Sequence, residues 1–219
     1  MTSFARAERA ALADALLAAG PDAPTLCEGW ATRDLAAHLV LRERRPDAAA
    51  GILIKPVAGH TKKVQDRLAA GDYAALVEKV RTAAPHVRPA FAEEAVNLVE
   101  FFIHLEDVRR AAPGWVPREL PEAYARALGS RAKGSARLSA RRFPARIVVR
   151  SPGLRPTAEP IVEPFTVGKG DPDPARQVTV EGDPGELLLF FTGRQAAAGV
   201  ELTGPEDLVE RLRGARLGI

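Results

Sequence analysis

Three side chains on two predicted helices have the types and the spacing of a metal site. Glu100 and His104 are four residues apart in the stretch AFAEEAVNLVEFFIHLEDVRRAA. This spacing places both side chains on one face of a helix, one turn apart. His38 belongs to an earlier helix-forming stretch, DLAAHLVLRERR, beside several leucines. If the two helices pack together, His38 faces the pair from the opposite wall, which is how helical bundles build metal sites.

Two imidazoles and one carboxylate form a ligand set that suits zinc and leaves a position for water or substrate. The same set also suits iron(II), manganese or nickel. An open zinc position lowers the pKa of a bound water or thiol, which makes hydroxide or thiolate available near neutral pH. A Glu–His pair at this spacing and a single helical histidine also occur without a metal, so a purely structural role stays open as an alternative.

Helical periodicity dominates the first two thirds of the chain. Thr32 is expected to cap the helix that carries His38, with Asp34 in its first turn. Ser3 is expected to cap the first helix, and Asp72 the second half of an interrupted one. The predicted helical stretches cover roughly residues 3–20, 32–45, 61–80, 90–112 and 120–142.

The last third of the chain changes character and predicts strands. ARIVVRS, PIVEPFTVG and RQVTVEG are rich in β-branched residues, and GELLLFFTGR and DLVERLRGARL follow as helices. Helices with antiparallel strands in one small unit predict an α+β module. We therefore expect a mainly α protein with two domains, a helical one over 1–142 and a small α+β one over 143–219.

Composition narrows the classes of function. Lys+Arg number 31 against 28 for Asp+Glu, and aromatic residues make up 5% of the chain, which argues against nucleic-acid binding despite a basic predicted helix over 126–142. The longest apolar runs are too short for a membrane span. The single cysteine, Cys27, permits no internal disulfide and predicts a cytoplasmic protein. P-loop, dinucleotide-binding and serine-hydrolase motifs are missing.

The run LCEGWATRDLAAHL, residues 26–39, resembles the signature of the DinB-like metal-binding helical bundles. More narrowly it is similar to the N-terminal domain of mycothiol-dependent maleylpyruvate isomerases. VEFFIHLEDVRRA over 99–111 resembles the second signature of that family, and DPGELLLFFTGRQAA over 183–197 resembles its small C-terminal domain. The resemblance implies a four-helix bundle with zinc held by His38, Glu100 and His104. It also implies mycothiol or a related low-molecular-weight thiol as cosubstrate.

Two functions follow as hypotheses. The first is a metal- and thiol-dependent transferase or isomerase that acts on a small electrophilic or acidic substrate, with carboxylates held by Arg42 and Arg194. The second is a non-catalytic metal-dependent binding or sensing protein. Arg42 can equally be a solvated helix end. The oligomeric state stays open, a homodimer included.

Other polar residues near the ligands have both a functional and an ordinary interpretation. We expect Cys27 to be a small buried apolar residue, with a redox-sensitive or metal-approaching thiol as the alternative. Asn97, Glu106 and Asp107 are expected on a solvated face or at a cap, with hydrogen bonds to the ligands as the alternative. The remaining histidines, His60 and His86, are expected at the surface.

Overall fold

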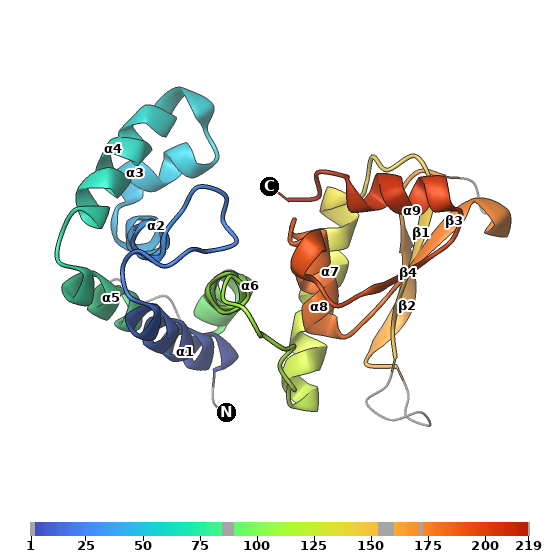
Figure 1. Ribbon diagram of the computed structural model, residues 1–219, viewed down its shortest axis with the longest axis horizontal. Helices are drawn as coiled ribbons and strands as arrows, with labels where there is room; N and C mark the ends of the chain where they lie inside the picture. The colour runs from blue at the N-terminus through green and yellow to red at the C-terminus, as the bar shows by residue number, and fades with distance from the viewer. Residues whose placement is uncertain (1–2, 85–89, 153–159, 171–172, 219) are drawn as a thin grey trace. The chain divides into compact units, whose positions relative to one another are not determined.

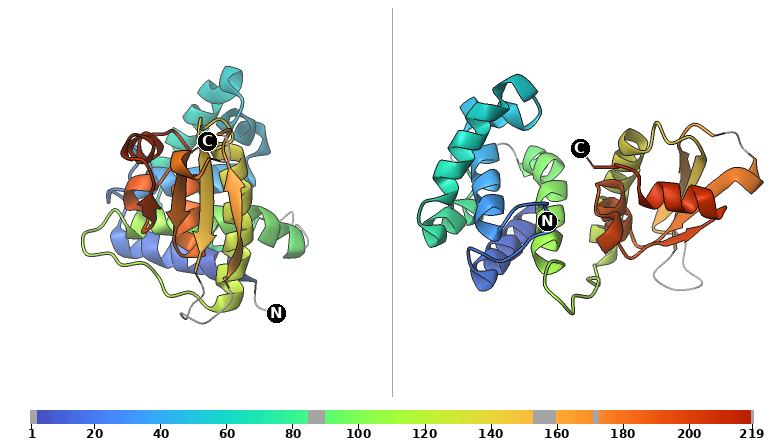
Figure 2. Two further views of the ribbon diagram at one scale, coloured as in Figure 1. Left: turned by 90° about the vertical axis from the view of Figure 1, so that its right-hand side faces the viewer. Right: turned by 45° about the horizontal axis from the view of Figure 1, so that its top comes forward.

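The computed structural model describes residues 3–84, 90–152, 160–170 and 173–218. The chain divides into two compact units, Met1–Val116 and Pro117–Ile219. Figures 1 and 2 show that helices make up the first unit and that the second combines helices with a sheet. The expectation of a mainly helical protein with a small sheet is therefore confirmed. Within the described part of the chain, no helix is both long and apolar enough to cross a membrane.

The first unit is built from helices that pack pairwise. α1 packs on α6 and α5, and α2 packs on α4 and α5. Short 3-10 helices at Ala50–Ile52 and Lys55–Val57 link α3 to α4. The bounds are α1 Phe4–Ala19, α2 Thr32–Arg44, α3 Pro46–Ala49, α4 Ala58–Ala69, α5 Tyr73–Arg81 and α6 Ala90–Arg109.

Helix ends in this unit follow local signals with one exception. Ser3 accepts a hydrogen bond from the Arg6 amide and caps α1. Asp72 accepts from the Ala75 amide at 2.7 Å and caps α5. The expectation that Thr32 caps α2 is wrong, because Thr32 is already the first helical residue.

The Thr32 hydroxyl is buried and donates instead to the Gly20 carbonyl, which ties the start of α2 to the end of α1. The residue before the helix is Ala31, whose amide donates to the Asp34 carboxylate at 3.0 Å. The start of the helix that carries His38 is thus fixed by Asp34 and by a tertiary bond rather than by a side-chain cap.

The second unit contains a four-stranded sheet in the order β2-β1-β3-β4. β1 (Arg146–Ser151) pairs antiparallel with β2 (Val162–Val167), and β3 (Gln177–Glu181) pairs antiparallel with β4 (Glu201–Thr203). The two central strands run parallel, with Ile147 opposite Val178. The expectation of antiparallel strands is therefore confirmed for β1 with β2 and for β3 with β4. It is wrong for β1 with β3, because the chain crosses over between β2 and β3.

Helices complete the second unit. α7 (Glu122–Ser139) packs on α8 (Pro184–Phe191) and on β2, and α9 (Glu206–Arg213) packs on β3. Gly129 lets α7 approach β2, since a Cβ there would meet the Val162 side chain at 2.1 Å. α7 thus belongs to the second compact unit, and the division falls earlier in the chain than the domain boundary that we predict after residue 142.

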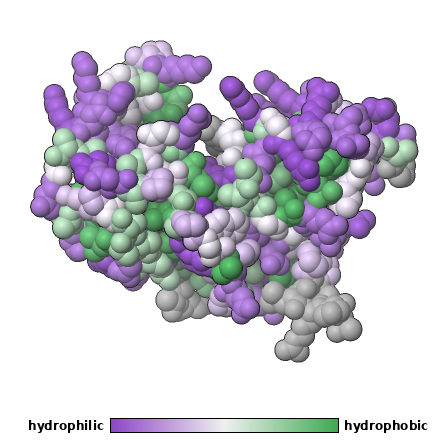
Figure 3. Space-filling model, viewed as in Figure 1, coloured by the Kyte–Doolittle hydropathy of each residue, from purple (hydrophilic) through white to green (hydrophobic). Residues whose placement is uncertain are grey.

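Apolar side chains fill the interiors of both units. In the first unit, α1, α2, α5 and α6 each bury leucines or other large apolar residues, among them Leu12, Leu35, Val77 and Phe101. On the face drawn in Figure 3, hydrophilic side chains cover much of the surface and leave only small apolar patches.

Candidate metal centre

His38, Glu100 and His104 come together in the first unit. The Nε2 atoms of both histidines lie 3.3 Å from the same Glu100 oxygen, Oε1. The two imidazole rings face each other edge to face, with centroids 5.5 Å apart and an interplanar angle of 72°. Both histidines are about nine-tenths buried. α2 supplies the first ligand and one face of α6 supplies the other two, as the four-residue spacing predicts.

The distances between these donor atoms suit a tetrahedral ion. Zinc binds imidazole nitrogen and carboxylate oxygen at about 2.0–2.1 Å, so tetrahedral ligands lie about 3.3 Å from one another. The two Nε2–Oε1 distances have this length. The donor types, borderline imidazoles with one hard carboxylate, also match zinc. The residues present therefore fit a divalent metal.

Arg42 positions the carboxylate of the set. Its Nε lies 3.4 Å from Glu100 Oε1, and one of its Nη atoms donates to Asn97 Oδ1 at 2.9 Å. Burial alone would raise the pKa of the Glu100 carboxyl. Hydrogen bonds from the two histidines and the nearby positive charges outweigh burial and hold this pKa well below its usual range.

Asp107 orients His104 from the other side of the ring. Its Oδ2 lies 2.9 Å from His104 Nδ1, and the Asp107 side chain is fully buried. Burial alone would lower the pKa of His104. The hydrogen bond with Asp107, helped by Cys27 and Glu100, raises this pKa well above its ordinary value. With Nδ1 engaged by a carboxylate, Nε2 is the nitrogen that faces the other donors, which is the common arrangement of a metal-binding histidine.

The loop before α2 covers the His38 side of the centre. The Trp30 ring lies against His38, with centroids 5.1 Å apart. Thr25 holds this loop, because its hydroxyl donates to the Trp30 carbonyl at 2.9 Å. The Gly29 backbone has φ +76°, a conformation that glycine adopts without strain. The Gly-Trp pair of the sequence signature therefore serves to place an indole beside a ligand.

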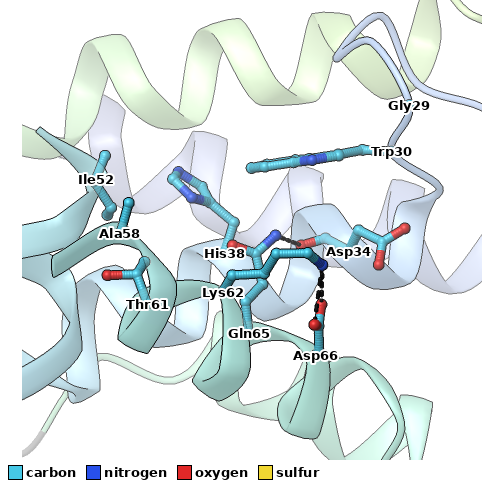
Figure 4. Close-up of a pocket in the computed structure, with 10 residues that line it drawn as sticks. All are labelled: Gly29, Trp30, Asp34, His38, Ile52, Ala58, Thr61, Lys62, Gln65 and Asp66. Carbon is cyan, nitrogen blue, oxygen red and sulfur yellow. Dashed lines mark hydrogen bonds and ion pairs between the residues drawn. The ribbon is translucent and has the colours of Figure 1, made fainter. Parts of the chain in front are cut away.

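A cavity of about 420 Å³ adjoins His38. Trp30 and His38 lie on one side of it, and Thr61, Lys62 and Gln65 of α4 line the other (Figure 4). Lys62 forms an ion pair with Asp66 at 2.9 Å near the same wall. The cavity volume lies in the range of small-molecule sites.

Several expectations about neighbouring residues are wrong. Cys27 is partly exposed and donates to Asp107 Oδ2 at 3.2 Å, so it is more than an apolar filler. Glu106 and Asp107 are fully buried rather than solvated. Asn97 is buried between Arg42 and Glu43, because the polar face of α6 meets α2 at this point.

The remaining predicted residues have partners other than the three ligands or fall outside the described chain. His60 is exposed and lies 3.3 Å from Asp47. In the second unit, one Nη of Arg194 donates to the Thr192 carbonyl at 2.8 Å. His86 falls outside the described residues. The substrate-binding roles of Arg42 and Arg194 stay predictions.

Sequence reasoning missed the α4 wall of the cavity. Lys62 and Asp66 form an i,i+4 pair, which in a sequence has the pattern of an ordinary solvated helix face. Thr61 and Gln65 carry no distinctive spacing. The nearest signal was the apolar run between α3 and α4, whose Ile52 also lines the cavity.

The fold and the three-ligand cluster define a helical protein with a candidate divalent-metal centre. The model of the mycothiol maleylpyruvate isomerase N-terminal domain matches residues 4–158, and the chain belongs to this family. No curated protein sequence matches the chain.

Two solved structures are similar to this chain. They are crystal structures of the mycothiol-dependent maleylpyruvate isomerase and of a histidine-to-alanine mutant of it. Their sequence identities are 17% and 16%, and their TM-scores are 0.53 and 0.55, respectively. In both, the match covers 93% of this chain and 96% of the other. At these identities the likeness shows a shared fold.

Proposed function

We propose that the protein binds one divalent metal ion, zinc, through His38, Glu100 and His104. We further propose that it is a metal- and thiol-dependent transferase or isomerase that acts on a small electrophilic substrate. The observation that carries the proposal is the convergence of two Nε2 atoms on one carboxylate oxygen at 3.3 Å. The four-helix bundle that the resemblance implies, with α4 and α5 as one interrupted helix, is part of the same proposal.

The charges around the ligands support a cation at this point. Burial lowers the pKa of His104, but hydrogen bonds with Asp107 and Glu100 outweigh burial, raise this pKa and favour a proton on the ring between the two carboxylates. A divalent cation would take over the role of that proton and balance the same two carboxylates. When bound, zinc supplies a Lewis acid that lowers the pKa of an adjacent thiol or water.

The protein's own residues prepare the rest of the site. The buried Asp107 fixes the ring orientation of His104, and Arg42 fixes Glu100. The Trp30 indole covers His38 and gives the cavity an apolar wall that excludes water from that side. Lys62 and its ion-pair partner Asp66 both line the opposite wall. An acidic group on a substrate or on a thiol cosubstrate would compete with Asp66 for the Lys62 ammonium.

Mycothiol or a related low-molecular-weight thiol is the proposed cosubstrate. The family to which the chain belongs takes its name from a mycothiol-dependent isomerase. The cavity next to His38 can hold part of such a molecule. Arg42 and Arg194 remain the proposed partners of substrate carboxylates.

Metal content is the first test. Protein purified without a histidine tag is expected to contain close to one zinc per chain, and His104→Ala is expected to lose it. His60→Ala is the matched control, because His60 is an exposed histidine of the same unit that touches none of the three ligands. A wild-type protein that stays metal-free after incubation with zinc would refute the proposal.

Thiol binding is the second test. The zinc-loaded protein is expected to bind mycothiol in calorimetry, and His38→Ala without metal is expected not to. Zinc binding without binding of mycothiol or of a simpler thiol would refute the thiol-dependent reaction and favour a metal-dependent binding or sensing protein.

A further inference from the structure

The second ring nitrogen of His104 has its own set of metal-ligating neighbours. His104 Nδ1 lies 2.9 Å from Asp107 Oδ2 and 3.9 Å from Cys27 Sγ. Cys27 Sγ lies 3.2 Å from the same Asp107 oxygen. A thiol, an imidazole and a carboxylate therefore meet at one point, and their donor atoms all lie within 4.8 Å of one another.

The backbone fixes the sulfur at this point. The amide of Leu26, next to Cys27 in the chain, donates to the Asp107 carbonyl at 3.0 Å. The Cys27 amide donates to the Thr25 hydroxyl at 3.2 Å. One main-chain bond thus joins the Cys27 loop to α6, and the Thr25 hydroxyl holds the Cys27 amide within the loop, so the thiol lies beside Asp107 without depending on a metal.

We propose that Cys27, His104 and Asp107 form a second metal position, selective for thiophilic ions such as Cd²⁺ or Cu⁺. Thiolate ligands select soft ions, whereas imidazole and carboxylate alone favour borderline and hard ones. For an ion of zinc's size, with a metal–sulfur bond of about 2.3 Å and a metal–nitrogen bond of about 2.0 Å, tetrahedral sulfur and nitrogen donors lie about 3.5 Å apart. The three observed distances, 2.9, 3.2 and 3.9 Å, bracket this value.

The two metal positions share His104 and exclude each other. A neutral imidazole offers a lone pair on only one nitrogen and keeps a proton on the other. When Nε2 binds a metal, Nδ1–H donates to Asp107. When Nδ1 binds a metal, Nε2–H donates to Glu100, which lies 3.3 Å away. Each set therefore contains the carboxylate that orients the ring for the other.

Binding at the thiolate position forms a metal–sulfur bond and releases the Cys27 thiol proton to solvent. The oxidation state of the ion and of the sulfur stays unchanged. One ion per chain is expected whichever metal is supplied, and zinc and cadmium are expected to compete although most of their ligands differ.

Cadmium titration in thiol-free buffer tests this position with two matched variants. Wild type is expected to bind one Cd²⁺ per chain with an ultraviolet thiolate-to-cadmium charge-transfer band. Cys27→Ser removes a donor of the thiolate position only, so the band is expected to vanish and Cd²⁺ affinity to fall by at least about tenfold. Its zinc affinity changes little, because the serine hydroxyl can still donate to Asp107.

His38→Ala removes a donor of the first position only. It is expected to keep the cadmium band and to lose zinc affinity by at least about tenfold. If circular dichroism shows that His38→Ala does not fold, His38→Gln is tested in its place. Absence of the band in wild type, or its equal loss in His38→Ala, would overturn the proposal. A cadmium band in a protein that fails to bind zinc would leave this position intact and refute only the proposed function.

Discussion

The two compact units differ in what they bury. Most buried polar and charged residues in the described chain belong to the first unit: Glu8, Arg9, Thr32, His38, Thr61, Asn97, His104, Glu106, Asp107 and Arg110. In the second unit the buried polar residues are Ser151 and Glu186. Buried charge is costly unless it is paired. The first unit must therefore pair its buried charges, a demand that the second unit largely avoids.

Buried and half-buried polar residues of α1, α2 and α6 form a chain that ends at the candidate metal centre. Arg9 on α1 donates to Glu43 at 2.8 Å, and Asn97 donates to the same carboxylate at 3.3 Å. Arg42 links Asn97 to Glu100. Buried hydrogen bonds and ion pairs position metal ligands within a bundle. They carry a desolvation cost that apolar packing would avoid.

The described part of the second unit buries few polar side chains and is packed mainly with apolar ones. Ile147 and Val149 of β1 and Val178 and Val180 of β3 are at most 1% exposed. They line one face of the two central strands, and α8 is buried along its whole length. The candidate metal centre therefore lies in the unit that buries most of the polar side chains, whereas the second unit is packed mainly with apolar ones.

The largest effect on stability is expected for Glu106→Ala in the first unit. The Glu106 carboxylate accepts from Arg110 Nε at 2.6 Å, and both side chains are 1% exposed. Removing the carboxylate leaves a buried guanidinium without its main counter-charge, which costs about 3–5 kcal/mol. Urea unfolding measures this loss.

The double variant Glu106→Leu with Arg110→Met is the control. It removes both charges, so most of the loss is expected to be recovered. A decrease in unfolding free energy of less than about 1 kcal/mol for Glu106→Ala would mean that the buried ion pair contributes little to the stability of the first unit.

Leu188→Ala in the second unit is expected to cost about 2–5 kcal/mol through loss of burial and the cavity left behind. Leu188 lies in α8 and is fully buried. Zinc affinity at 25 °C is expected to stay at the wild-type value, because no described ligand neighbour belongs to α8. Thermal unfolding measures the loss of stability, and calorimetric titration measures zinc affinity. A large loss of zinc affinity would contradict the idea that the metal centre depends on the first unit alone.

Local signals in the sequence predicted much of this fold. Ser3 and Asp72 cap helices as their residue types predict, and the length of α6 follows from its apolar periodicity. The order of β1, β2 and β3 along the chain was also visible. The parallel pairing of β1 with β3 was not, because register between distant strands depends on the crossover. The three-residue β4 was too short and too exposed to leave a pattern.

The residues of the candidate site likewise divide into those that the sequence predicted and those that it did not. The spacing of Glu100 and His104 placed them on one face, and the Gly-Trp signature pointed to His38. The contact between Cys27 and Asp107 joins residues 80 positions apart, and no local pattern encodes it. Lys62 faces the cavity because of how α4 packs on α2, which the sequence of α4 alone cannot show.

Asp107→Asn is expected to reduce zinc affinity by about 10–100-fold, because the partner that orients a metal-bound histidine loses its charge. Glu186→Gln is the matched control in the second unit. Glu186 is also a buried carboxylate, and it accepts from the Gly199 amide at 2.6 Å. Isothermal titration with zinc is expected to separate the two variants, and equal affinities would show that Asp107 does not act through His104.

The smallest effect on stability is expected for Lys62→Ala, at about 0.5 kcal/mol or less, because its ion pair with Asp66 is exposed to solvent. Arg213→Ala in the second unit removes the comparable exposed pair with Glu210 and sets the baseline. Only Lys62 lines the cavity beside His38, so only Lys62→Ala is expected to weaken binding of an acidic ligand or of the thiol to the zinc-loaded protein. Calorimetric titration of both variants with the ligand measures this. Equal ligand affinities would indicate that the arginines, rather than Lys62 of α4, bind the acidic group. A loss of affinity confined to Lys62→Ala would show that Lys62 serves in ligand binding although its contribution to stability is negligible.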